Sequence, residues 1–147
     1  MRIVARETFE MAGCSLDDID ALDLYSCFPS AVQIACDEMG IPLDDHRGLT
    51  ITGGLPYFGG PGNNYVTHSI AEMINHVRAR PGTKGLVTAN GNYVTKQSAG
   101  IYSTEPLDKL FSPKDPNVYQ AEINSKKGPV FTEFANGNAI IETYTIM

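Results

Sequence analysis

The segment Gly53-Gly-Leu-Pro-Tyr-Phe-Gly-Gly-Pro-Gly62 decides the fold, because it places five glycines within ten residues. Glycines at this density are typical of a loop that approaches a neighbouring backbone closely or adopts positive φ angles. A phosphate-binding loop is disfavoured, because no Lys directly follows these glycines. The residues just before the loop, Leu49–Thr52, predict a short strand that leads into it.

The residues after the loop predict a long helix and then a strand that turns back. Apolar residues recur at helical spacing between residues 62 and 80, namely Val66, Ile70, Met73, Ile74 and Val77. Lys84–Asn90 predicts a strand, and Asn90-Gly91 predicts a tight turn that lets Gly100–Ser103 pair back. Strand and helix signals therefore alternate on this side of the loop.

The residues before the loop show the same alternation. A helix is predicted over residues 1–12, with Gly13 as its stop. Ile19–Tyr25 alternates in polarity and predicts a strand, and a second helix is predicted from about Ser26 to Gly40, with Pro29 in its first turn. Residues 1–105 therefore predict an α/β layer with a mostly parallel sheet and helices.

The pattern changes after residue 105. Residues 106–116 are rich in Pro and Asp and predict a linker, while 118–124 and 139–146 read as strands with no helix between them. We expect residues 117–147 to begin an additional small all-β domain, which at ~30 residues is too short to bury a core of its own. Both ends of the chain are expected to be cuts within a longer protein.

Composition excludes several classes of protein. The chain has 147 residues, of which 42% are apolar and 19% charged, which is typical of a soluble globular protein. A net charge of −6 argues against nucleic-acid binding, and no apolar run approaches the ~20 residues of a membrane span. The three cysteines include no CxxC pair, so we expect reduced thiols, a cytoplasmic location and no metal site.

Three segments in order resemble the C-terminal half of the thiolase superfamily, especially the sterol-carrier-protein-type thiolases and acetyl-CoA acetyltransferases. Asp23-Leu-Tyr-Ser-Cys-Phe28 resembles the motif NEAF or HDCF, and Gly53–Pro61 resembles the GG…GHP loop. Leu86-Val-Thr-Ala-Asn-Gly91 occupies the place of the CxG loop. The tail with Glu142-Thr-Tyr-Thr resembles the start of the extra β domain of thiolase-like proteins type 1.

The resemblance implies chemistry on a coenzyme A thioester as substrate, with no covalently bound cofactor. The cysteine nucleophile would lie in an N-terminal half that this chain lacks. The histidine of GHP, which would act as the base, is replaced by Gly60, and Tyr25 replaces the oxyanion-holding His or Asn. Thr88-Ala-Asn90 stands at the CxG position, and Thr88 cannot replace an acid/base cysteine.

Tyr25, His68 and Asn90 are the candidate catalytic residues. The candidate substrate-binding residues are Gly59, Gly60, Pro61, Asn63, Asn64 and Tyr65. Each has a structural alternative: His68 could bond a backbone carbonyl, and Tyr25 could pack at the end of a buried strand. Asn63, Asn64 and Tyr65 could cap the following helix instead of lining a channel. Cys27 reads as a small apolar filler.

Two functions follow from the resemblance. The first is part of a thiolase-like acetyl-CoA acetyltransferase of lipid metabolism, whose partners would be acyl-CoA and either the rest of the thiolase chain or a homodimer partner. The second is a non-catalytic acyl-CoA or lipid binder that keeps the fold, which the glycine at position 60 favours. A structural subunit that pairs with a nucleophile-bearing partner is a third interpretation.

Overall fold

The computed structural model describes residues 1–108 and 110–146. It divides the chain into two compact units, Met1–Pro113 and Lys114–Met147. The first unit holds a sheet of three strands: β1 (Ala21–Asp23), β2 (Lys84–Gly91) and β3 (Lys96–Ser103). No helix in the described ranges has the length and apolar character needed to cross a membrane.

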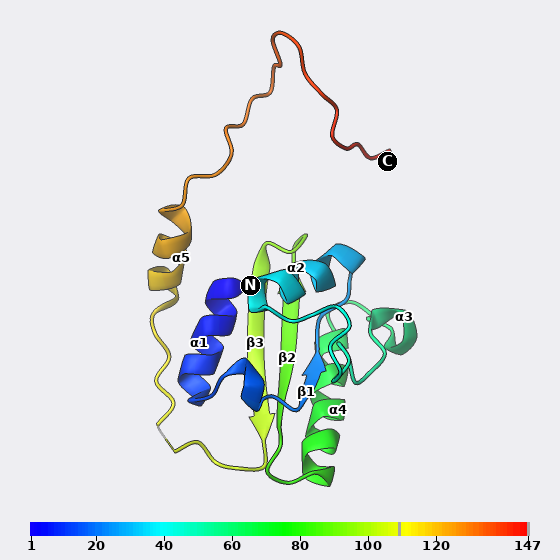
Figure 1. Cartoon of the computed structure of the whole chain (residues 1–147), viewed down its shortest axis with the longest axis vertical. Helices are drawn as coiled ribbons and strands as arrows, with labels where there is room; N and C mark the ends of the chain where they lie inside the picture. Colours follow the sequence, from blue (N-terminus) through cyan, green and yellow to red (C-terminus); the bar gives the residue numbers. More distant parts are fainter. Residues whose placement is uncertain (109, 147) are drawn as a thin grey trace. The chain divides into compact units, whose positions relative to one another are not determined.

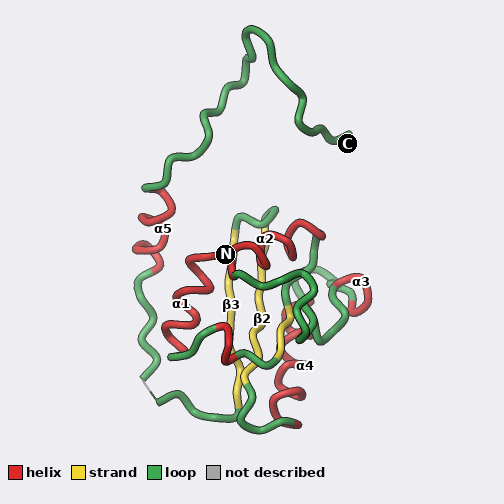
Figure 2. The backbone as a smooth tube through the Cα atoms, in the orientation of Figure 1, coloured by secondary structure: helices red, strands yellow, loops and turns green. Residues whose placement is uncertain are grey.

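The sheet has the order β1-β2-β3 and is mixed. β1 runs parallel to β2, with Ala21 opposite Gly85, and β2 runs antiparallel to β3. Figure 2 shows the three strands side by side, and in Figure 1 the carboxyl ends of β1 and β2 point toward the same end of the sheet as the β2–β3 turn. The predicted α/β class is confirmed.

Helices cover both faces of the sheet, which gives the first unit three layers. Its helices are α1 (Arg2–Ala12), α2 (Pro29–Met39), the short α3 (Leu55–Phe58) and α4 (Tyr65–Ala79). One buried cluster packs Leu22, Leu24 and Leu86 of the strand segments against Ala35 and Cys36 of α2, with Phe9 of α1 beside them. A second cluster packs Ala21 and Val87 against Met73 and Val77 of α4. Because successive strand residues point to opposite faces, Asp23 lies on the α4 face with Ala21.

Local signals explain where the two N-terminal helices end. Gly13 follows α1 and Gly40 follows α2, with left-handed φ angles of 64° and 72° that close each helix. Pro29 occupies the first turn of α2, where its missing N–H costs nothing. These predicted helices are confirmed, and so is the long helix before Pro81-Gly82.

Two local predictions in the first unit are wrong. Residues 49–52 do not form a strand. The carboxylate of Asp23 accepts hydrogen bonds from the N–H groups of Ile51 and Thr52, which in a strand would donate to a neighbouring strand. The tight turn at Asn90-Gly91 is not formed either, because Asn90 pairs with Gln97 and Gly91 with Lys96 in the β2–β3 ladder. The turn lies at residues 92–95, where three non-glycine residues have positive φ.

The described residues of the second unit form one helix, α5 (Pro116–Asn124), where the sequence pattern predicts a strand over residues 118–124. Asp115 accepts a hydrogen bond from Asn117 N at 2.9 Å, and Pro116 begins the helix, so a capped helix start outweighs the alternating pattern. From residue 125 to 146 the described chain contains no strand, so the strand predicted for 139–146 is wrong. That these residues begin an additional domain stays a prediction.

Candidate functional site

Polar side chains gather where the parallel strands β1 and β2 end. Asp23 and Val87 are register partners, so the residues that follow each of them lie at the same edge of the sheet. Tyr25 N donates to Thr88 Oγ1 at 2.9 Å, and Cys27 Sγ lies 3.2 Å from Asn90 Oδ1. Tyr25 and Asn90, both predicted as site residues, therefore lie at one edge, and Cys27 joins them through a polar contact rather than as an apolar filler.

The glycine loop is fixed against this edge by Ser26. Ser26 Oγ accepts a hydrogen bond from Leu55 N at 3.0 Å, at the start of α3. Gly54 has φ 83° and ψ 178°, and a Cβ built on it would lie 2.7 Å from Ser26 Oγ. A glycine is required at this position because the loop passes so close to the strand end.

The other predicted binding residues lie along the loop and the start of α4. Gly59 and Gly60 are half-buried, and the space next to Gly60 is filled by Leu55 and by Tyr65. Pro61, Asn63 and Asn64 are exposed. Asn64 is the N-cap residue of α4, but its side chain makes no capping hydrogen bond and contacts His68 instead.

His68 lies one turn into α4, with its ring next to that of Phe58. Asn64 Nδ2 is 3.2 Å from His68 Nε2, and the Phe58 and His68 ring centroids are 5.1 Å apart. The donor and acceptor roles in this contact depend on the His68 tautomer, and the other ring nitrogen is Nδ1. This Nδ1 is buried and has no hydrogen-bond partner among the described residues.

Tyr65 connects the two groups of site residues. Its ring meets that of Tyr25 edge-on, with centroids 5.4 Å apart, and its hydroxyl lies 2.9 Å from Asp23 Oδ1. Its side chain is buried, so the hydroxyl makes hydrogen bonds inside the protein and does not face solvent. Within the part of the chain that the structure describes, no hydrogen bond joins His68 to Tyr25 or Asn90.

The Tyr25 hydroxyl at the site is protonated at neutral pH. Burial raises the pKa of the Tyr25 hydroxyl, and the nearby Cys27 and Tyr65 raise it further. Tyr25 therefore remains a hydrogen-bond donor. Burial is also the main cause of the raised pKa values of Cys14 and Cys36, so these two thiols lack thiolate character.

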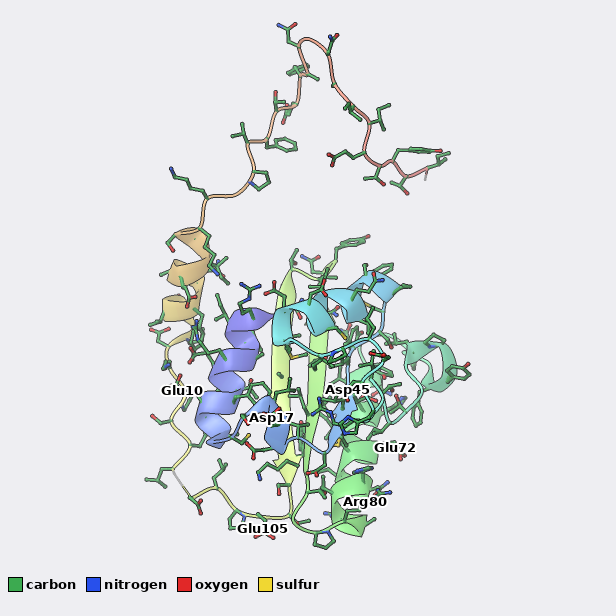
Figure 3. All side chains as sticks on the ribbon, in the orientation of Figure 1. Glu10, Asp17, Asp45, Glu72, Arg80 and Glu105 are labelled. Carbon is green, nitrogen blue, oxygen red and sulfur yellow. The ribbon has the colours of Figure 1, made fainter. Side chains whose placement is uncertain are left out.

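A surface depression lies at the opposite, amino end of β1 and is unrelated to this chemistry. Its lining includes Ile19 and Asp20, and also Asp17 and Asp45, which Figure 3 labels. Arg47 also lines it, but donates to both Asp45 oxygens and to the carbonyls of Leu16 and Ile19. Arg47 therefore holds the loop and offers no evident site for a ligand.

Sequence reasoning assigned no role to Asp23 or Ser26, although both belong to the Asp23–Phe28 segment. The structure makes them the residues that join the strand end to the glycine loop. The available signal was a carboxylate between the apolar residues Leu22 and Leu24 of a predicted strand, because a buried charge needs partners. Those partners lie far along the chain, so no local pattern could name them.

Comparison with known proteins supports one fold. No protein-family model matches the chain, and no curated protein matches it. A similar solved structure is that of a monomeric SCP2-thiolase-like protein type 1 from Mycobacterium smegmatis, with a TM-score of 0.83 and 48% identity. The match covers 92% of this chain and 30% of that one, so the chain spans less than a third of the length of that protein. The chain has the α/β fold of part of an SCP2-thiolase-like protein.

Proposed function

We propose that this chain forms the acyl-CoA-binding part of a thiolase-like protein, with the thioester held at the carboxyl ends of β1 and β2. The observation that carries the proposal is the contact of Cys27 Sγ with Asn90 Oδ1 at that edge, where the Tyr25 backbone N–H also donates to Thr88. In open α/β sheets, ligands bind outside the carboxyl ends of the strands. The similarity to an SCP2-thiolase-like protein supports a ligand related to acyl-CoA.

The polar groups at this edge suit a thioester carbonyl. The Cys27 thiol donates to Asn90 Oδ1, which leaves the Asn90 amide N–H groups to donate to a ligand. The Tyr25 hydroxyl keeps its proton because its pKa is raised. Two neutral donors of this kind would bind a carbonyl oxygen and favour negative charge that develops on it.

Acyl transfer of the acetyl-CoA acetyltransferase type is the second candidate, which the similarity to an SCP2-thiolase-like protein favours. The position expected to carry the base is Gly60, against which Leu55 and Tyr65 pack. Catalysis would therefore need His68 as base and a nucleophile from a segment or partner outside this chain. That this region is the C-terminal part of such an enzyme stays a prediction.

The test is a titration of the 147-residue chain with acetyl-CoA. Binding is measured by calorimetry and by the NMR signals of Asn90 and Tyr25. Asn90→Ala removes a donor to the thioester and is expected to weaken binding about 5- to 10-fold. Asn75→Ala, at an exposed position of α4, is the matched control and should bind as wild type does. Absence of binding at millimolar acetyl-CoA, or equal binding by both variants, would contradict the proposal.

A further inference from the structure

Asp23 is a fully buried carboxylate at the end of β1. Its exposed fraction is 0%, and it faces α4 because it shares the strand face of Ala21. No Lys, Arg or His of the described residues forms an ion pair with it. Burial of a carboxylate without a cation is costly, so hydrogen bonds must compensate the charge.

Six hydrogen-bond contacts from two other segments converge on this carboxylate. Oδ2 accepts from the 50–52 segment: from Thr50 Oγ1 at 2.8 Å, Ile51 N at 3.1 Å, Thr52 N at 3.2 Å and Thr52 Oγ1 at 3.0 Å. Oδ1 accepts from α4: from Tyr65 OH at 2.9 Å and from Ser69 Oγ at 2.6 Å. One side chain therefore joins β1, the segment before the glycine loop, and α4.

The three joined segments are those that carry the candidate site. Tyr25 follows Asp23 by two residues, the glycine loop begins directly after Thr52, and His68 precedes Ser69. We propose that Asp23 is a positioning residue of the proposed acyl-CoA site, which sets the glycine loop and the His68 end of α4 against the strand end. That an acyl-CoA site is positioned rests on the proposed function. That Asp23 positions the three segments rests on its contacts alone.

The two oxygens of Asp23 have different requirements. Oδ2 faces two backbone N–H groups, which can only donate, so an acceptor must remain there. Oδ1 faces the hydroxyls of Tyr65 and Ser69, which can rotate and accept instead. Asparagine can therefore replace Asp23 with its oxygen toward the 50–52 segment and its amide nitrogen toward α4, whereas leucine has no acceptor for either.

The test compares Asp23→Asn and Asp23→Leu in the full chain, with Asp37→Asn on the exposed side of α2 as the control for loss of a charge. Three quantities are measured: amide exchange at Ile51 and Thr52 relative to Leu86, the NMR signals of the His68 imidazole, and affinity for acetyl-CoA. In Asp23→Leu we expect exchange at 51 and 52 to rise at least about tenfold while Leu86 keeps its protection. The His68 signals should move and acetyl-CoA affinity should fall.

Asp23→Asn should stay within a few-fold of wild type in all three quantities, as should Asp37→Asn. Equal loss of protection at Leu86 and at residues 51 and 52 in Asp23→Leu would make the residue merely structural and overturn the proposal, as would unchanged His68 signals. If Asp23→Leu does not fold, Ser69→Ala decides, because it removes one α4 contact and should move the His68 signals while Ile51 exchange is retained. If the wild-type chain does not bind acetyl-CoA, the proposed function is wrong. The amide exchange at Ile51 and Thr52 and the His68 signals would still test whether Asp23 positions these segments.

Discussion

Gly54→Ala is expected to destabilise the first unit strongly, because Gly54 combines a strained conformation with a close contact. Its φ of 83° and ψ of 178° lie in a region that only glycine occupies readily. A Cβ there would also stand 2.7 Å from Ser26 Oγ. The serine would have to rotate and release its hydrogen bond from Leu55 N.

The magnitude follows from these two costs. Backbone strain of this kind costs about 1–3 kcal/mol. Loss of the Ser26 hydrogen bond adds roughly 0.5–1.5 kcal/mol, so the free energy of unfolding should fall by about 2–4 kcal/mol. Gly59→Ala isolates the strain, because Gly59 has φ 74° and ψ 165° and an added Cβ would meet nothing within 4 Å. Gly91→Ala has neither cost, since its φ is not positive and its Cβ would meet nothing.

Urea unfolding of the full chain, followed by circular dichroism, measures this order. The midpoint should fall most for Gly54→Ala, by roughly 1–2 M, less for Gly59→Ala and least for Gly91→Ala, with a constant m-value. Equal midpoints for Gly54→Ala and Gly59→Ala would show that the Ser26 contact contributes nothing. A Gly54→Ala protein as stable as Gly91→Ala would refute the reasoning as a whole.

Three further predictions concern packing, pH and activity. Gly85→Ala should destabilise the fold by about 1–3 kcal/mol in thermal or urea unfolding, because its Cβ would overlap the buried Met73 Sδ of α4. The side-chain hydrogen bonds from Arg47 hold the pKa of Asp45 below its usual range. They therefore stabilise the fold at pH values above the Asp45 pKa of the unfolded chain, about 3.9. This contribution is lost as the pH falls through the lower Asp45 pKa of the folded chain. Asp45→Asn should therefore flatten the acid limb of the stability–pH curve, and an unchanged acid limb would contradict the assignment. The chain alone should neither cleave acetoacetyl-CoA nor condense acetyl-CoA, because the proposed base position is Gly60, which has no side chain; turnover that co-purifies with the chain through several columns would contradict this.

Local signals predicted much of the fold. Pro29 and Gly40 bracket α2 as expected, because capping depends on neighbours in sequence. The same reasoning failed at Asn90-Gly91, where ladder pairing with residues 96 and 97 outweighed a strong turn signal. It failed again at residues 118–124, where the Asp115 cap starts a helix that an alternating pattern does not predict.

Some residues of the candidate site could be proposed from the sequence, and others could not. Tyr25 and Asn90 are proposed from the family resemblance, and the structure places both at one edge of the sheet because β1 and β2 are parallel; that they act on a ligand stays a prediction. The role of Asp23 could not be predicted, because its partners at residues 50–52, 65 and 69 become neighbours only after folding. A buried hub built from distant hydrogen bonds leaves no periodic pattern in the sequence.

The parallel pairing of β1 with β2 has a consequence for the order of folding. β2 and β3 are joined by a short turn, whereas Ala21 of β1 pairs with Gly85 only after α2, the glycine loop and α4 have been placed between them. Closing long loops is slow compared with forming a hairpin, so we expect the β2–β3 hairpin to appear early and β1 to dock late. The Asp23 carboxylate would then stay hydrated until the rate-limiting step, and the edge that carries Tyr25 would be the last part of the unit to become native.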